Sequence, residues 1–399
     1  MSTIEGRIDI DLYPSHKKGE RVRLSSSRPV HAARILLGKT PQQALDIIPL
    51  LFNICGTAQS HAALNAIESA LESSPPGQAA HADELARRLL VNIETCKEHM
   101  LRLFLDWPSL FYLEHNNDQL PWLSSLVAHF RNALYRDGQA FTLDRQLQPQ
   151  IDTLDRLLAE LDDYLQQHVF GITPDDWLDS ITDIGGLHDW ALHGDTIAAR
   201  SIATICDKGW ASQGLSDCAL LPPMSAQQLQ QLFDDAAEDF IAAPRWQGRC
   251  HETSPLSRQF DQPLIQALHQ EFDNTLITRW LARLVELASI PRQLQHIRRQ
   301  LTDAPADALR QGEIAHHTCG GLSQVEAARG RLIHRVQIED DLISRYQILA
   351  PTEWNFHPQG LVRQSLDSIS VGDRNGLGTL AHIVINAIDP CVGYELRIH

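Results

Sequence analysis

Leucine and isoleucine recur every three or four residues through most of the chain between positions 83 and 300. A clear example, with acids and glutamines between the apolar positions, is Leu154, Leu157, Leu158, Leu161 and Tyr164. That spacing places the apolar side chains on one face of an α-helix, and such a face is buried against other elements. The middle of the chain is therefore predicted to be a bundle of helices joined by turn-rich loops.

Short runs with the two-residue period of β-strands lie toward both ends of the chain. Residues 8–12 alternate apolar and acidic side chains and residues 22–24 repeat the pattern, which predicts an edge hairpin. Residues 332–338 and 342–348 are β-rich and flank an acidic turn, which predicts a second hairpin. We expect a mainly helical α+β protein with one domain, made of an N-terminal hairpin (1–30), a helical body (31–315) and a C-terminal hairpin, helix and tail (316–399).

Helix ends are marked by residues that cap or break a helix. The pair Thr40-Pro41 predicts a helix start, because threonine caps the first turn and proline fits its first position. A later helical run, 380–388, is expected to end at Asp389, because the residue before a proline is pushed out of the helical region. Cys391 is therefore predicted to lie just beyond a helix end.

Charge and hydropathy exclude several classes of protein. The chain has 34 Lys+Arg and 50 Asp+Glu, and its net charge of -16 opposes binding to nucleic acid or to anionic lipid. No run approaches the roughly 18 apolar residues of a membrane helix, so no membrane insertion is expected. We expect a cytoplasmic protein without a secretory signal, because the N-terminus carries Glu5, Arg7, Asp9 and Asp11.

The 7 cysteines lack the short repeated spacings of a disulfide framework or a zinc knuckle, so reduced thiols are expected. Cys55 is a candidate metal ligand because Gly56 lets the backbone approach a bound group closely. The helix that follows is expected to lower the pKa of the Cys55 thiol. Cys391 follows the end of a helix, whereas Cys55 precedes the start of one. If the two sulfurs meet, segments from both ends of the chain form a single site.

Short blocks along the chain resemble, in order, the conserved blocks of the large subunit of nickel-iron hydrogenases. They are residues 4–8, 28–41, 54–56, 252–258, 326–330, 350–355 and 389–391. They are similar to the family's IEGH, RGFE..L.GRDP, ICGxC, EVGPLAR, EAPRG, VPTTWN and DPCxxC motifs. The resemblance implies a large-subunit-like fold, with a central helix bundle and small sheets formed from both chain ends.

In that family four cysteines hold the metals, and this chain keeps half of them. Cys55 and Cys391 match the first cysteine of each Cys-x-x-Cys pair, whereas Ala58 and Tyr394 stand at the second positions. A methyl group cannot bind a metal, and a phenol is a hard oxygen donor that suits a soft bimetallic site poorly. The resemblance therefore implies that the bridge between nickel and iron cannot form and that nickel is not the expected cargo.

This pattern of loss resembles the HupK/HoxV group of hydrogenase accessory proteins. The resemblance implies a non-catalytic maturation scaffold or chaperone that holds or relays an Fe(CN)2CO unit before its transfer. Cys55 and Cys391 would bind the iron transiently, and the Arg329 guanidinium would face a cyanide nitrogen. Arg28 and Glu5 would lie around these ligands. The expected partners are a HypC-type maturation chaperone and the hydrogenase large subunit.

Other interpretations stay open at this point. The chain could be an atypical nickel-iron hydrogenase large subunit, or a metal-free interaction protein that mimics that subunit. Arg329 could be an ion-paired arginine. His99 is expected in the core or on the surface, and the residues around His316 and Cys319 are expected in a loop, because adjacent side chains diverge in an extended segment.

Overall fold

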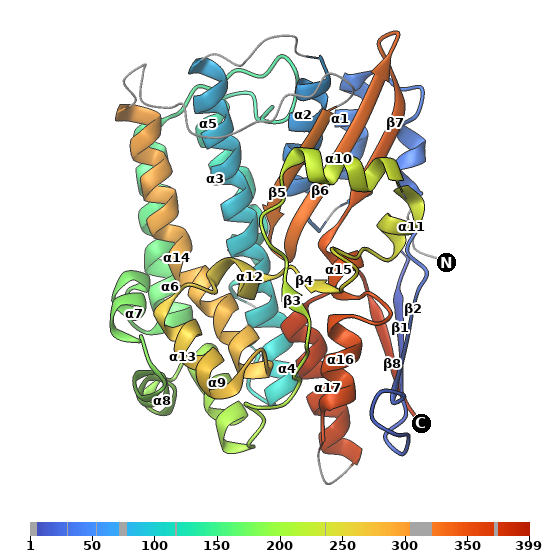
Figure 1. Ribbon diagram of the computed structural model, residues 1–399. Coiled ribbons are helices and arrows are strands. Elements are labelled where there is room, and N and C mark those ends of the chain that lie inside the picture. The colour runs from blue at the N-terminus through green and yellow to red at the C-terminus, as the bar shows by residue number, and fades with distance from the viewer. Residues whose placement is uncertain are drawn as a thin grey trace.

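The computed structural model describes residues 6–29, 31–52, 54–71, 78–115, 118–235, 237–303, 321–370 and 374–399. Within these ranges the protein is mainly helical and carries three small sheets (Figure 1), which confirms the expected α+β class. The candidates Glu5, His316, His317 and Cys319 lie outside the described residues.

Two long helices, α3 (Gln78–Leu101) and α14 (Leu276–Asp303), pack side by side in the helical body (Figure 1). The predicted amphipathic run forms α6 (Ile151–Leu165), which buries its apolar face against α14 and α5 (Leu120–Leu134). The other helical elements of the body are η2 (Arg102–Asp106), α4 (Trp107–Phe111), η3 (Gln166–Phe170), α7 (Pro174–Ser180), α8 (Ile184–His193), α9 (Ile197–Asp207), α12 (Pro255–Gln259) and α13 (Pro263–Phe272).

The two chain ends share one sheet. Strand β1 (Ile8–Leu12) pairs antiparallel with β2 (Val22–Ser26) and parallel with β8 (Tyr394–Ile398). The N-terminal hairpin is confirmed, but the prediction that both its strands lie at an edge was wrong for β1. Strand β8, which we expected to be part of a tail, covers the free side of β1. This pairing brings the segment around Cys391 next to the N-terminal strands.

A second sheet has the order β5-β6-β7, and its strands are β5 (Gly321–Ala327), β6 (Gly330–Glu339) and β7 (Leu342–Leu349). The β6–β7 hairpin confirms the prediction, whereas β5 was not predicted. Helix α2 (Gly56–Leu71) packs on this sheet so closely that a Cβ at Gly321 would lie 1.6 Å from the Ala66 carbonyl oxygen. The sheet therefore fixes the position of α2 and of the residues at its start.

Short elements surround the helical body and the β5-β6-β7 sheet. The 3-10 helix η1 (Ala32–Leu36) precedes α1 (Pro41–Leu51), which starts at the predicted Thr40 cap. The remaining elements are β3 (Ala219–Leu220), α10 (Ala226–Asp235), α11 (Ala237–Ala242), β4 (His251–Glu252), α15 (Pro351–Asn355), α16 (Leu361–Ser368) and α17 (Arg374–Ile388). Helix α17 ends immediately before Asp389, as predicted, and Asp389 has a φ of 61°. Of the helices described, none has the length and apolar character needed to cross a membrane.

Candidate functional site

Cys55 and Cys391 line the same cavity, which has a volume of about 70 Å³. Cys55 immediately precedes α2, and Cys391 follows α17. The structure thus brings together the two sulfurs that the sequence singles out, and Arg28 lines the cavity with them. Its wall also includes Phe52, Gln59, Ile348, Glu353 and Val392.

The Cys391 sulfur has two polar partners. The Arg28 guanidinium donates a hydrogen bond to it over 2.8 Å, and the Thr352 hydroxyl lies 2.8 Å from the same sulfur. The Thr352 oxygen also accepts a hydrogen bond from the Cys391 backbone nitrogen over 3.4 Å, so Thr352 contacts both the backbone and the sulfur of Cys391. Arg28 in turn pairs with Glu353 over 3.1 Å. Burial disfavours the charge on Arg28, but Cys391 and Glu353 together raise its pKa above the usual value. Arg28 and Thr352 therefore hold the Cys391 sulfur in place at the cavity.

Cys55 has a different environment. Burial and the nearby Cys391 raise the pKa of the Cys55 thiol to about 12. The expectation that the helix start lowers this pKa was therefore wrong. The main physical reason is burial, which disfavours the charged thiolate, and Glu94 adds to it. The Glu94 carboxyl accepts hydrogen bonds from the backbone N–H groups of Thr57 and Ala58 over 2.8 and 2.9 Å. These two N–H groups at the start of α2 are thus bound to Glu94 and are not free to stabilise a thiolate at Cys55.

Arg329 is an ion-paired, buried side chain. Its guanidinium lies 3.2 Å from Glu98 and 3.3 Å from Asp389. Asp389 also pairs with Arg102 over 3.0 Å, and these arginines hold the pKa of the Asp389 carboxyl below its usual value although burial opposes this. Because Asp389 stands two residues before Cys391, Arg329 braces the turn that carries the sulfur. Its contact with a diatomic ligand stays a prediction.

The residues at the two lost cysteine positions lie away from the cavity wall. Ala58 is fully buried in an apolar cluster with Ala62 and Val325. The Tyr394 hydroxyl lies 2.9 Å from His382 Nδ1, and neither Ala58 nor Tyr394 lines the cavity. In the part of the chain that the structure describes, no three His, Cys, Asp or Glu side chains gather closely enough to hold a metal ion.

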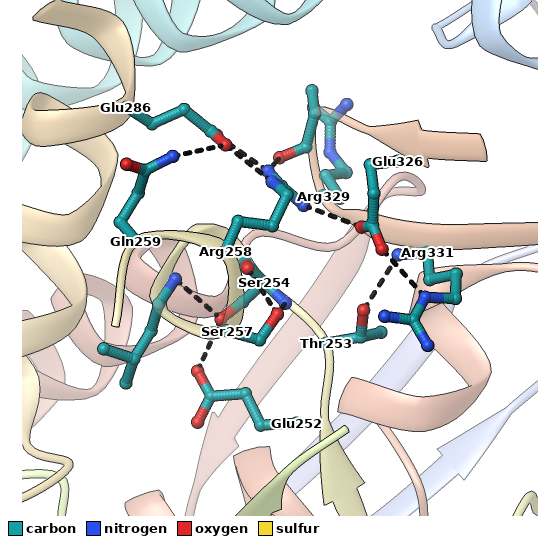
Figure 2. A network of polar contacts seen from close by, with 12 residues as sticks. Glu252, Thr253, Ser254, Ser257, Arg258, Gln259, Glu286, Glu326, Arg329 and Arg331 are labelled. Atoms are coloured by element: carbon teal, nitrogen blue, oxygen red, sulfur yellow. Dashed lines mark hydrogen bonds and ion pairs between the residues drawn. The ribbon is translucent and has the colours of Figure 1, made fainter. Parts of the chain in front are cut away.

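The block at residues 252–258 forms a polar network beside this region (Figure 2). Arg258 binds both carboxylate oxygens of Glu286, over 2.5 and 2.7 Å, and donates to the Ala328 carbonyl over 3.1 Å. Glu286 is also 2.7 Å from His99, which is buried. Ser254 donates to Glu252 over 2.7 Å. The network joins α12, α14 and the end of β5, so the blocks that resemble EVGPLAR and EAPRG hold each other in place.

Sequence reasoning did not single out Gln59 and Glu353, which line the cavity, or Thr352, which contacts the Cys391 sulfur. Gln59 lies one helical turn after Cys55, and its Nε2 is 3.7 Å from the Cys55 sulfur. That four-residue spacing is the signal that could have found it. Thr352 and Glu353 belong to the block that resembles VPTTWN, but their contacts depend on how α15 meets Cys391.

Comparisons with known proteins identify relatives of the whole chain. The family described as nickel-dependent hydrogenase matches residues 196–392. The hydrogenase expression/formation protein HoxV of Cupriavidus necator is 30% identical over 396 residues, which cover 96% of this chain and 94% of HoxV. The hydrogenase expression/formation protein HupK of Azotobacter vinelandii is 29% identical, and the match covers 98% of each chain.

The fold has solved counterparts. The Ni-Fe-Se hydrogenase of D. vulgaris Hildenborough superposes with a TM-score of 0.64 at 17% identity, over 93% of this chain and 92% of that chain. This likeness confirms the large-subunit-like fold. With full-length similarity to HoxV and HupK, the chain belongs to the family of hydrogenase expression/formation proteins that these two represent.

Proposed function

We propose that this protein is a non-catalytic scaffold in the maturation of a nickel-iron hydrogenase and that its cavity holds an Fe(CN)2CO unit as cargo. The observation that carries the proposal is that Cys55 and Cys391, from opposite ends of the chain, line one cavity. The relatives HoxV and HupK, which are hydrogenase expression/formation proteins, support the role in maturation.

The chemistry of the cavity suits such a cargo. Two thiolates are soft ligands, and a low-spin iron that carries cyanide and carbon monoxide can accept them. Cys55 loses its proton when it binds a metal, because only the thiolate is a ligand. The volume of about 70 Å³ is several times the roughly 10–15 Å³ that one water needs, so a small group of atoms fits.

The number of protein ligands sets the lifetime of the complex. Two sulfurs bind the iron less firmly than the four cysteines of the large subunit bind their metals, so the cargo can leave. Arg28, at the cavity, and Arg329, behind Asp389, provide positive charge beside the cyanides. Glu5 is a further candidate by its position in the N-terminal block. A HypC-type chaperone in the cytoplasm would deliver the unit, and the hydrogenase large subunit would receive it.

Infrared spectroscopy tests the proposal. The protein is purified from cells that mature a nickel-iron hydrogenase, alongside the double variant Cys55→Ala plus Cys391→Ala. Cyanide and carbonyl stretching bands are expected in the wild type and not in the double variant. Cys206→Ala is the control, because Cys206 is an exposed thiol elsewhere. A wild-type protein without these bands would overturn the proposal.

Two other outcomes would identify the alternatives. Stoichiometric nickel together with hydrogen-dependent dye reduction would indicate an atypical hydrogenase. A double variant that still supports full hydrogenase maturation in cells would indicate a metal-free interaction protein.

A further inference from the structure

A chain of hydrogen bonds runs from the β6–β7 hairpin to the Cys55 sulfur. The Tyr346 hydroxyl lies 2.9 Å from His334 Nδ1, and His334 Nε2 lies 2.8 Å from Gln59 Oε1. Gln59 Nε2 then lies 3.7 Å from the sulfur. Gln59, His334 and Tyr346 are 2%, 0% and 5% exposed, so bulk water does not compete for these contacts. The proposed scaffold function assigns no role to His334 or Tyr346.

The donor and the acceptor in each of these hydrogen bonds follow from the Tyr346 hydroxyl. Among the described residues, His334 is the only hydrogen-bond partner of the buried Tyr346 hydroxyl. The hydroxyl proton has no other acceptor there, so it is paired only when Tyr346 donates and His334 Nδ1 accepts. Burial lowers the pKa of His334 to about 3, so the ring is neutral and carries its one proton on Nε2. That proton is donated to Gln59 Oε1, because the carbonyl oxygen can only accept.

The amide of Gln59 is therefore held in one orientation. Its oxygen is bound to His334, and its NH2 group is left on the side of Cys55. Gln59 also lines the cavity, so this NH2 group is a polar donor in the wall beside the sulfur. The wall otherwise includes the apolar side chains of Phe52, Ile348 and Val392. A small group bound there meets a fixed donor near Cys55, the paired Arg28 and Glu353 side chains near Cys391, and hydrocarbon on its other sides.

We propose that Gln59 is a cargo-binding residue whose amide N–H donates a hydrogen bond to the nitrogen of a metal-bound cyanide, and that His334 and Tyr346 are its positioning residues. This inference rests on the proposed function. A cyanide nitrogen carries negative charge and accepts strongly, whereas a carbonyl ligand is a weak acceptor that suits the apolar wall. The fixed amide thus selects which ligand of the iron lies beside Cys55.

The test measures the infrared bands of the loaded protein in three variants. Gln59→Leu removes the donor, His334→Phe removes its anchor, and Tyr346→Phe removes only the hydroxyl that sets the histidine tautomer. We expect the cyanide bands to shift in all three and the carbonyl band to move less. Tyr164→Phe is the matched control, because the buried Tyr164 hydroxyl has no hydrogen-bond partner among the described residues, and its bands should equal those of the wild type.

The outcomes separate this inference from the proposed function. Cyanide bands that keep their wild-type frequencies in Gln59→Leu would overturn the inference and leave the scaffold role intact. A wild-type protein without any such bands would overturn the scaffold role itself.

A second measurement needs no cargo. Nitrogen-15 chemical shifts of His334 in the unloaded protein are expected to report a proton on Nε2. A proton on Nδ1 would mean that the Gln59 oxygen faces Cys55, which would contradict the inference even where the Gln59 and His334 variants fail to fold.

Discussion

The guanidinium of Arg28 donates a hydrogen bond to the sulfur of Cys391 over 2.8 Å, although one residue follows β2 and the other follows α17. The contact exists because β8 pairs with β1 and draws the C-terminal segment against the N-terminal strands. Arg28 also pairs with Glu353, so a single side chain ties the sulfur to α15. The geometry of the candidate ligand Cys391 therefore depends on packing between both ends of the chain.

The first prediction concerns the stability that Arg28 contributes. Arg28→Ala should lower the free energy of unfolding by about 1.5–3 kcal/mol, because it leaves the little-exposed carboxylate of Glu353 without its ion pair. Arg34→Ala is the control, since Arg34 is 61% exposed and its pair with Glu238 should contribute about 1 kcal/mol or less. Urea denaturation measures both values, and equal losses would contradict the prediction.

The second prediction concerns Gly330, which follows Arg329. Its φ is +131°, and a Cβ there would lie 2.3 Å from the Thr253 carbonyl oxygen. Gly330→Ala should therefore destabilise the fold by about 3 kcal/mol or more, from steric overlap and backbone strain together. Gly209→Ala is the matched control, because Gly209 has a φ of +66° and open space around it, and only about 1–2 kcal/mol of strain is expected. Equal stability of the two variants in thermal unfolding would contradict the prediction, because it would mean that the backbones of Gly330 and Thr253 can move apart.

The third prediction concerns the pH dependence of stability. The pKa of His334 is about 3 in the folded protein, whereas an unfolded histidine has a pKa near 6.5. Between these values the unfolded state binds the proton and the folded state does not, so stability falls as pH drops from about 6.5 toward 3. His334→Gln should reduce this slope by about 1.4 kcal/mol per pH unit. Chemical denaturation at several pH values measures this slope, and a His334→Gln variant that keeps the wild-type slope would contradict the prediction.

The fourth prediction concerns Tyr394, which stands where related hydrogenases have a cysteine. Its hydroxyl is bound to His382, so Tyr394→Phe should cost about 1 kcal/mol of stability and leave the cyanide and carbonyl bands unchanged. Calorimetry and infrared spectroscopy measure the two effects. Loss of the bands in this variant would instead make the phenol a ligand of the cargo.

Much of the fold could be predicted from local patterns. The capping of α1 by Thr40, the β6–β7 hairpin and the end of α17 before Asp389 all depend on residues within a few positions of one another. Strand β5 was missed because its buried positions include Gly321 and Ser323, so the alternation of burial along it is not an alternation of apolar and polar side chains. Strand β8 has such a pattern, because Tyr394, Leu396 and Ile398 alternate with charged residues, but its pairing with β1 joins segments from opposite ends of the sequence.

The amino-acid sequence alone determined which helices and hairpins form and which two cysteines could serve as ligands, because periodicity, capping and motif order are local properties. Only the tertiary structure decided what surrounds those sulfurs. Glu94 occupies the helix start that we expected to acidify Cys55, Arg28 and Thr352 contact Cys391, and His334 orients Gln59. The physical reason is that a thiol's charge and a donor's direction are set by groups a few ångströms away in space, and here most of those groups come from distant parts of the chain.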